Sequence, residues 1–327
     1  MPIKSINIPY VCPYTGEDLI KDKNKYISTS KRVFYIRKEI PRFCKEDNYT
    51  QSFGLQWNLF DRTQLDSSCD IKLSHNRFWA QTGWDPKGLD KFSILEVGSG
   101  AGRFTEAFLK STNCNLYSVD YSSAVEANLR NNYNFKKRLN LCQASIYQMP
   151  FKDNSFDKIF CFGVLQHTPS FEKSIEALVS KVKINGEIVV DFYPIKGFYT
   201  KIHAKYFLRP ITKRISKKTL LFLIRKSIPI SLLIFDILSK IKLAFLIRFL
   251  PITDVRTFPK TLDKKQRTEW AIMDTFDCFS PEHDNPQRLN DVINMFKKFN
   301  CEIIFGGLVK FNGGSSLVVR AKKLFVK

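Results

Sequence analysis

The sequence lacks the cysteine and histidine patterns that hold metals or disulfides in small domains. Its eight cysteines are scattered, at positions 12, 44, 69, 114, 142, 161, 278 and 301, and no two form a C-x-x-C pair. Only four histidines occur, at positions 75, 167, 203 and 283. These spacings argue against a zinc ribbon and against a disulfide framework, so a reducing cytoplasm is the expected compartment.

Long uncharged runs and acidic residues are also scarce. Residues 1–7 contain no apolar signal-peptide core, and charges interrupt every run of about 18 residues, so neither a signal peptide nor a membrane span is expected. The chain carries 52 Lys and Arg against 31 Asp and Glu, a net charge of +21. Residues 196–248 hold 13 of these cations and a single acid, Asp236. Aromatic residues are not interleaved with the cations in an RNA-binding pattern, so nucleic acid is not the favoured partner.

One glycine-rich stretch carries most of the functional information. An apolar run with Glu96 as its third residue is followed by glycines at every second position, Gly98, Gly100 and Gly102. The next apolar run ends in Asp120, 22 residues after the first glycine. A strand, a tight glycine turn and a helix are predicted here, and a carboxylate in this position accepts the hydroxyls of a ribose. The chain is therefore predicted to bind a cofactor that contains adenosine.

The glycine spacing excludes two other nucleotide motifs. A dinucleotide fold needs G-x-G-x-x-G, and Arg103 stands where its third glycine is required. A phosphate-binding P-loop needs Gly-Lys-Ser/Thr, which does not follow these glycines. The E-x-G-x-G-x-G pattern instead resembles motif I of the class I S-adenosyl-L-methionine-dependent methyltransferases, in particular their type 11 domain.

Further segments resemble the same family, in the same order, over about residues 90–195. They are the strand that ends at Asp120 and Tyr121, the loop 143–151 with Ser145 and Ile146, the strand entry 153–160 and the segment 163–169. The resemblance implies S-adenosyl-L-methionine as the cofactor. It implies these binding residues: Glu96, Gly98, Ser99, Gly100, Gly102, Asp120, Tyr121, Ser145, Ile146 and Gly163. Ser145 departs from the aspartate that the family often has there, which implies a weaker, neutral contact to the adenine.

Strands and helices alternate from residue 93 to residue 192, which predicts a doubly wound parallel sheet of the α/β class. By the resemblance, strands at 301–305 and 315–321 pair antiparallel through a hairpin at 311–314 and complete a seven-stranded Rossmann-like sheet. The expected parts of the chain are an N-terminal extension (1–75), a cofactor-binding core (76–194), a basic, apolar helical insertion (195–270) and the C-terminal part of the fold (271–327).

The N-terminal extension contains two features of interest. The segment 10–19 resembles the first knuckle of a small zinc ribbon, but only Cys12 of the expected ligands is present and Thr15 stands in place of the second. A tetrahedral site needs four ligands, so no metal is expected. Trp57 and Phe60, three residues apart, are interpreted either as the core face of a helix or as a cap over the cofactor.

The insertion admits two interpretations. Its apolar helices either cover the substrate pocket as a cap, or residues 196–250 lie on an anionic membrane surface with their cations toward the lipid. A cap that buries its apolar face in the protein is favoured, and both interpretations can hold together.

Methyl transfer to a hydroxyl needs a base that removes the proton. His167 follows Gly163 by four residues, beside the expected position of the methyl donor. The segment 274–284, expected as a loop, supplies Asp277 and His283 as second candidates. The alternatives are a histidine that only packs and a surface turn that caps the following helix.

The predicted function is methyl transfer to a small-molecule, sugar or lipid-linked acceptor, at oxygen. The alternative is a protein that binds S-adenosyl-L-methionine without transfer and acts as a partner or sensor. A nicotinamide-dependent oxidoreductase is opposed by Arg103. The sequence does not indicate the acceptor or the oligomeric state.

Overall fold

A computed structural model describes residues 8–69, 72–195, 197, 200, 202–241 and 243–325. The segment 1–7, in which no signal peptide is expected, lies outside the described residues, as do Lys196, Lys201 and Lys242 of the basic segment.

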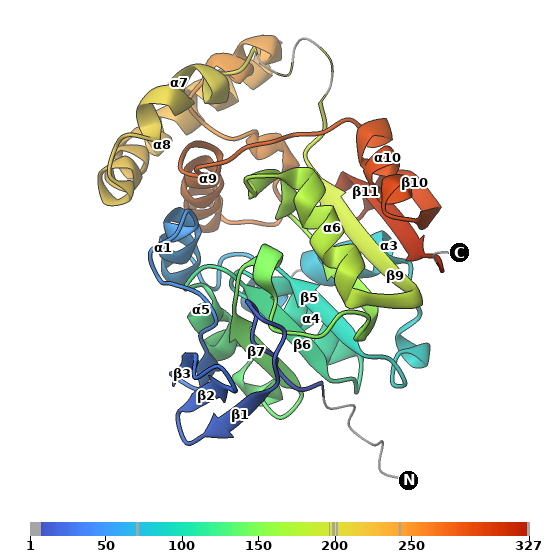
Figure 1. Cartoon of the computed structure of the whole chain (residues 1–327). Coiled ribbons are helices and arrows are strands. Elements are labelled where there is room, and N and C mark those ends of the chain that lie inside the picture. The colour runs from blue at the N-terminus through green and yellow to red at the C-terminus, as the bar shows by residue number, and fades with distance from the viewer. Residues whose placement is uncertain are drawn as a thin grey trace.

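The molecule is built on a seven-stranded sheet with the order β10-β11-β9-β8-β5-β6-β7 (Figure 1). The strands are β5 (Ile94–Val97), β6 (Leu116–Asp120), β7 (Leu139–Gln143), β8 (Phe156–Cys161), β9 (Val182–Phe192), β10 (Cys301–Phe311) and β11 (Gly314–Lys323). β5 pairs in parallel with β6 on one side and β8 on the other, so the strand order reverses there. β11 pairs antiparallel with β9 and β10. The predicted doubly wound sheet and its C-terminal antiparallel hairpin are confirmed.

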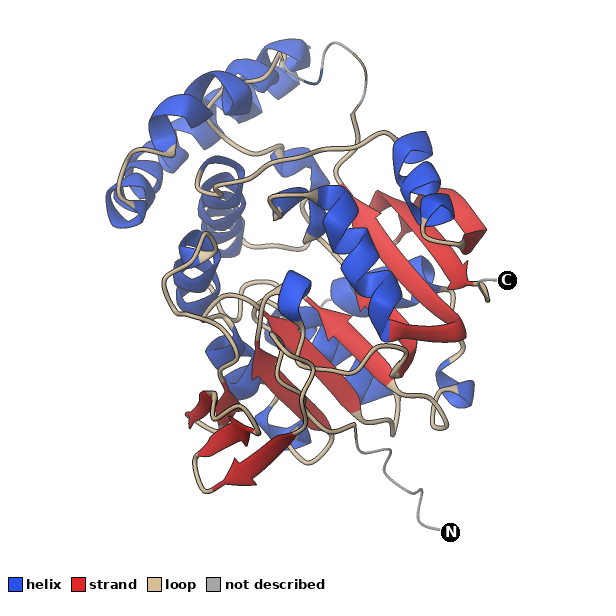
Figure 2. Ribbon diagram, in the orientation of Figure 1, coloured by secondary structure: helices blue, strands red, loops and turns tan. Residues whose placement is uncertain are grey.

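Helices cover both faces of this sheet (Figure 2). The helices outside the insertion are α1 (Gln51–Leu59), α2 (Asp66–Cys69), α3 (Leu73–Thr82), α4 (Arg103–Ser111), α5 (Val125–Asn131), α6 (Phe171–Lys181) and α10 (Leu289–Lys298). Ile94 and Leu116 face one core with α3 and α4, whereas Leu95 and Val97 face a second core with α6 and α10. Successive strand side chains alternate between the faces, and this double burial explains the continuous apolar runs of the sequence.

Helix α3 belongs to this fold although it precedes the glycine motif. Phe78 of α3 is fully buried, with ring contacts to aromatic side chains of β8, α4 and its own helix end. Arg320 of β11 donates hydrogen bonds to the backbone oxygens of Ala80 and Gln81 at the end of α3. These contacts tie the N-terminal part of the chain to its last strand.

A small antiparallel sheet lies at the β7 edge of the molecule. Its strands are β1 (Leu19–Asp22), β2 (Lys25–Ser28), β3 (Val33–Arg37) and β4 (Ile40–Pro41), in that order. The backbone amide of Phe43 donates to the oxygen of Gln143 at 2.8 Å, which joins the two sheets. Cys12 is buried in the same core as Phe34 and Phe43. Within the described ranges no three His, Cys, Asp or Glu side chains group as metal ligands.

The insertion is helical, as predicted. It contains α7 (Ala204–Thr212), α8 (Lys217–Lys240) and the first part of α9 (Lys264–Phe279), together with a short 3₁₀ helix, η6 (Ala244–Phe249). These elements form a third core that also takes in Phe60. They lie beyond the carboxyl ends of the parallel strands, at the upper left of Figure 1. Over the described residues no helix is both long and apolar enough to cross a membrane.

The expectation of a loop over residues 274–284 is wrong in its first half. Helix α9 runs to Phe279, so Asp274 and Asp277 stand on a helix, and the expected boundary at residue 270 falls inside it. A capping box between Asp263 and Gln266 starts the helix. Its buried residues follow the helical period: Trp270, Ala271, Met273, Thr275, Phe276 and Phe279.

Replacing Phe78 with alanine tests whether α3 is part of the core. We expect Phe78→Ala to lower the free energy of unfolding by about 3–5 kcal/mol, because a fully buried ring leaves a cavity. Denaturant titration followed by circular dichroism measures the change, with the exposed Tyr35→Ala as control. A change below about 1 kcal/mol would show that α3 does not stabilise the sheet.

Candidate active site

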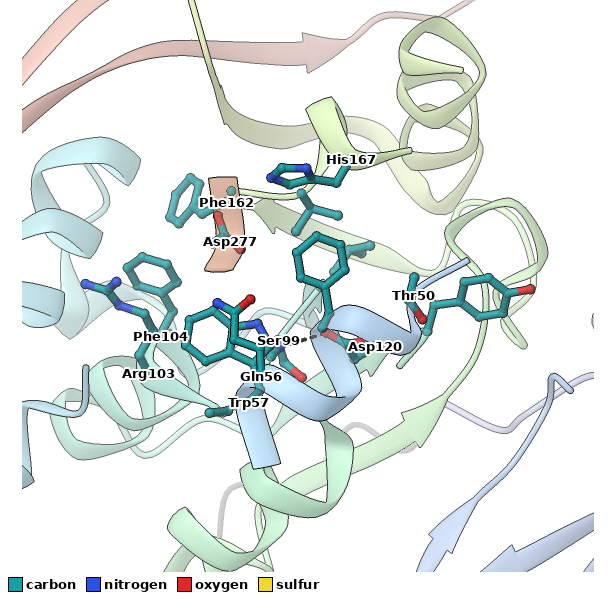
Figure 3. A pocket seen from close by; sticks show the side chains of 18 of the residues that line it. Thr50, Gln56, Trp57, Ser99, Arg103, Phe104, Asp120, Phe162, His167 and Asp277 are labelled. Atoms are coloured by element: carbon teal, nitrogen blue, oxygen red, sulfur yellow. Dashed lines mark hydrogen bonds between the residues drawn. The ribbon is translucent and has the colours of Figure 1, made fainter. Parts of the chain in front are cut away.

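A cavity of about 330 Å³ lies at the carboxyl ends of the parallel strands (Figure 3). Its walls come from the ends of β5, β6, β8 and β9, from α1 and from α9. The strand order reverses at β5, and the crevice beside such a point is where doubly wound folds bind ligands. The fold therefore places this cavity where the sequence motifs predict a cofactor.

The glycine turn forms the floor of the cavity. Gly98 and Gly100 have positive φ angles of 82° and 53°, a conformation that favours glycine. A Cβ atom on Gly98 would collide with the side chain of Val164. The backbone amide of Gly100 donates to Asp120 Oδ2 at 2.7 Å, which fixes the turn against the end of β6.

Asp120 is the anionic group of this floor. Its Oδ1 accepts from the backbone amide and the hydroxyl of Ser122, both at 2.7 Å. Burial raises the pKa of Asp120, and the hydrogen bonds from Ser122 and Gly100 oppose that shift. Oδ2 accepts from the Gly100 amide, and a carboxylate oxygen has a second lone pair that can take a ligand hydroxyl.

Helix α1 covers the glycine turn from above. A Cβ atom on Gly100 would lie 3.4 Å from Trp57 Nε1, so the indole lies over the turn (Figure 3). Trp57 lies on the cavity wall and so fits the interpretation as a cap over the cofactor. Phe60, 4% exposed, belongs to the third core and fits the interpretation as a core residue.

Unpaired polar atoms surround this cavity. The side-chain amide of Gln56 is buried, and neither its nitrogen nor its oxygen finds a hydrogen-bond partner among the described residues. Ser99 Oγ is likewise buried and without a partner in the described chain. Buried polar groups of this kind need a partner, so the cavity fits a ligand with several polar groups, such as an amino acid joined to a nucleoside.

Seven of the ten predicted cofactor residues lie on the cavity wall: Gly98, Ser99, Gly100, Asp120, Tyr121, Ile146 and Gly163. The structure places Glu96, Gly102 and Ser145 behind the wall, and each has a structural role there.

Glu96 of β5 is hydrogen-bonded to α4 and to β6, beneath the glycine turn. Its Oε2 accepts from the hydroxyls of Thr105 on α4 (2.5 Å) and Ser118 on β6 (2.8 Å), and burial raises its pKa to about 7. Gly102 is packed so closely that a Cβ atom would collide with Asn128. The hydroxyl of Ser145 accepts from the backbone amide of Tyr147 and begins a 3₁₀ turn. The side chains of Glu96 and Ser145 are thus hydrogen-bonded within the protein, and their expected contact with the cofactor stays a prediction.

His167 lies on the wall, at the top of Figure 3, with 6% of its surface exposed. Its ring packs between Phe53 of α1 (ring centroids 5.0 Å apart) and Tyr193 (5.5 Å). Nδ1 lies 3.2 Å from the backbone oxygen of His283. A carbonyl oxygen only accepts, so this bond requires the proton on Nδ1 and leaves Nε2 as the free acceptor of a neutral ring.

The other two candidate bases fall in different places. Asp277 lies on the wall, where its Oδ2 accepts from the hydroxyl of Tyr193 at 3.4 Å. The ring of His283 packs against Tyr49 and is not part of the wall. In this structure His283 contacts the site through its backbone oxygen, which orients His167, and the role of its side chain toward the substrate stays a prediction.

A charged group at the α9 end of the cavity was missed in the sequence. Arg103 is hydrogen-bonded to Gln64 and, at 3.1 Å, to Ser74 Oγ, and burial lowers its pKa to about 10. Asp274 accepts from Gln64 Nε2 at 3.3 Å, and burial, reinforced by Asp277, raises its pKa to about 7. No spacing signal predicts this group, because its members lie far apart in the sequence.

Comparison with known families supports the cofactor assignment. Residues 95–190 match the family model described as a methyltransferase domain. This segment is a methyltransferase domain. Its cofactor is S-adenosyl-L-methionine. The match covers less than a third of the chain, from β5 to near the end of β9.

Similarity to individual proteins is confined to the same segment. The chain is 25% identical to a sterol 24-C-methyltransferase of Saccharomyces cerevisiae over 100 residues, 30% of this chain and 26% of that protein. It is 27% identical to a tRNA U34 carboxymethyltransferase of Nautilia profundicola over 110 residues, 33% of this chain and 37% of that protein. The matched parts thus span less than half of these curated relatives.

Among solved structures, magnesium protoporphyrin IX methyltransferase from Synechocystis PCC 6803 is 14% identical, with a TM-score of 0.44 over 84% of this chain and 96% of that one. The resemblance of residues 10–19 to a zinc-ribbon knuckle finds no support in these comparisons and stays a prediction.

Removing the Asp120 carboxylate should weaken cofactor binding. A hydrogen bond to a charged group contributes about 1.5–3 kcal/mol, so Asp120→Ala should lower the affinity for S-adenosyl-L-methionine by about tenfold to a hundredfold. Isothermal titration calorimetry measures this. Asp157→Ala is the control. Asp157 stands at the start of β8, away from the cavity, and its carboxylate accepts a hydrogen bond from Ser93. An unchanged affinity in Asp120→Ala would refute its contact with the ribose.

Proposed function

We propose that the chain is an S-adenosyl-L-methionine-dependent methyltransferase that methylates an oxygen of a small-molecule, sugar or lipid-linked acceptor. The observation that carries this proposal is His167, a buried histidine on the cavity wall whose tautomer leaves Nε2 as a proton acceptor. The bound cofactor supplies a methyl group that its sulfonium already activates. The protein's remaining tasks are to align a hydroxyl, to remove its proton and to exclude water.

The environment of His167 suits a base at neutral pH. Burial lowers its pKa below the usual 6.5, while the negative charge of Asp277 and the bond to the His283 oxygen oppose the shift. A neutral imidazole is therefore the main form at pH 7. When Nε2 takes the proton of the acceptor, the charge of Asp277 stabilises the imidazolium that forms.

The α9 end of the cavity is suited to an acceptor with several polar groups. Arg103, Gln64 and Asp274 present donors and acceptors there, and Phe104 and Phe162 form the apolar part of the wall (Figure 3). Hydroxyls of a sugar ring match such a mixture. Pockets that set several polar groups among aromatic rings fix the orientation of a small molecule, which supports a small acceptor over a nucleic acid.

The proposal is tested by incubating the protein with methyl-labelled S-adenosyl-L-methionine and extracts of metabolites, glycans and lipid-linked sugars. Mass spectrometry of the labelled product locates the methylated atom, and a methyl ether or ester supports transfer to oxygen. Binding of the cofactor by calorimetry without transfer to any extract would favour the alternative, a binding protein that acts as a partner or sensor.

His167→Ala should lower turnover by about a hundredfold or more and leave the affinity for S-adenosyl-L-methionine nearly unchanged. The reason is that Nε2 faces the acceptor. His75→Ala is the matched control, since His75 is hydrogen-bonded to Ser111 away from the cavity wall. Near-normal turnover in His167→Ala would move the base to Asp277 or Asp274. Loss of cofactor binding would instead make His167 a residue that shapes the cofactor site.

The pH dependence of turnover separates these groups. A base must be unprotonated, so turnover should fall as the pH falls through the pKa of His167, which lies below 6.5. We expect this fall of turnover at acidic pH in the wild type and in Asp274→Asn. In His167→Gln it should disappear. A limb centred near pH 7 that disappears in Asp274→Asn would show instead that the ionised carboxylate of Asp274, whose pKa is about 7, is required.

A further inference from the structure

Helix α8 is apolar on two opposite faces. One face packs in the third core: Leu220, Leu221, Ile224, Ile228, Leu232 and Phe235. The other face is open and is formed by a row of exposed side chains, which we call the outer row: Phe222, Leu223, Ile230, Leu233, Ile234, Ile237 and Ile241. Members of the outer row are 40–64% exposed and recur at spacings of three, four and seven residues, so they form one stripe along the helix.

The outer row belongs to a wider concentration of exposed apolar side chains. Phe207 and Ile211 of α7 are 62% and 61% exposed, and Phe245 of η6 is 64% exposed. Twelve of the 25 large apolar side chains that are exposed in the described chain lie between residues 207 and 249. Single exposed apolar residues are ordinary, but a stripe of seven along one helix marks an interaction surface.

The charges on α8 indicate what this surface contacts. Lys226 and Lys240 share the face of the outer row by helical spacing, and Lys226 Nζ lies 5.8 Å from the ring centre of Phe222. Lys218 and Arg225 are exposed on the same helix. The one acid of residues 196–248, Asp236, is held by two hydrogen bonds from Arg267 of α9, at 2.6 and 2.9 Å. The surface is therefore apolar and cationic, with its acid neutralised.

We propose that the outer row of α8 docks the protein on an anionic lipid bilayer. Apolar side chains with lysines along the same face are the features of a helix that lies in the membrane interface, where long lysine side chains reach the headgroups. A second copy of the chain suits this surface less, because it would place lysines against lysines. The proposal does not depend on methyl transfer.

The buried face of α8 fixes the orientation of the docked protein. It packs on α9, which carries Asp274 and Asp277 on its other side, at the cavity wall. One helix thus separates the docking surface from the cavity. Both interpretations of the sequence stay predictions: a cap over the pocket would involve α9, which lines the cavity, and membrane contact would involve the exposed face of α8.

Sedimentation of the full chain with vesicles tests the proposal. Vesicles of phosphatidylcholine with phosphatidylglycerol are compared with pure phosphatidylcholine at low and high salt. We expect binding to the anionic vesicles only, weakened by salt, because surface charges are screened. No binding to anionic vesicles at low salt, or equal binding to both kinds, would overturn the proposal.

Two variants locate the surface. The triple change Ile230→Gln, Leu233→Gln and Ile237→Gln should reduce partitioning by about tenfold or more, because three apolar side chains no longer enter the lipid. The double change Lys226→Gln and Lys240→Gln should reduce it by a similar factor through lost attraction to the headgroups.

The control for these variants removes three exposed apolar side chains elsewhere, by Ile20→Gln, Ile304→Gln and Leu308→Gln. It should bind vesicles as the wild type does. Circular dichroism and the affinity for S-adenosyl-L-methionine should be unchanged in all variants, which separates lost docking from lost folding. If light scattering shows a wild-type dimer that the triple variant abolishes, and vesicle binding is absent, the surface joins two copies and the proposal is wrong.

Discussion

The half-buried carboxylate of Asp120 sets the shape of the cavity floor. It takes one hydrogen bond from the turn after β5 and two from the turn after β6, so a single side chain fixes two loops relative to each other. Asp191 of β9 acts in the same way at the next strand ends. It accepts from the amide of Gly163 at 2.6 Å, from Arg77 at 2.5 Å and from Gln81 at 2.9 Å.

The positions of these two carboxylates, Asp120 and Asp191, are explained by where the parallel strands end. Each lies at or near the carboxyl end of a parallel strand, where the loop amides have no strand partner and an acceptor is needed. The charge is desolvated there, and this is tolerated because charge-assisted hydrogen bonds compensate. Asp191 also draws α3 to the sheet through Arg77 and Gln81, so the floor of the cavity and the packing of the N-terminal part depend on each other.

The cofactor half of the site was predictable because its signals are local. Positive φ angles require glycine at Gly98 and Gly100, and the spacing to Asp120 reflects one strand, one helix and the next strand. The same local pattern did not show on which side of the wall a residue lies. Glu96 is directed away from the cavity because side chains alternate along β5, and Thr105 and Ser118 already bond it.

The acceptor half was not predictable from spacing. Gln64, Arg103 and Asp274 meet only because the segment between α1 and α2, the start of α4 and helix α9 converge over the strand ends. The acidic and aromatic residues at 274–279 were interpreted as a loop, whereas burial of Met273 and Phe276 against α8 stabilises a helix. Tertiary packing decided the local structure, since propensity in this segment is weak.

Helix α9 lies between α8 and the cavity. Its buried residues hold α8, and its acidic residues line the cavity. A helix that packs on both sides resists small displacements, because well-packed interiors accommodate them poorly. A change in the position of α8 would therefore pass to Asp274 and Asp277 through rigid contacts. The exposed face of α8 and the charged end of the cavity are thus linked through α9, although Asp274 lies 33 positions after Ile241 in the sequence.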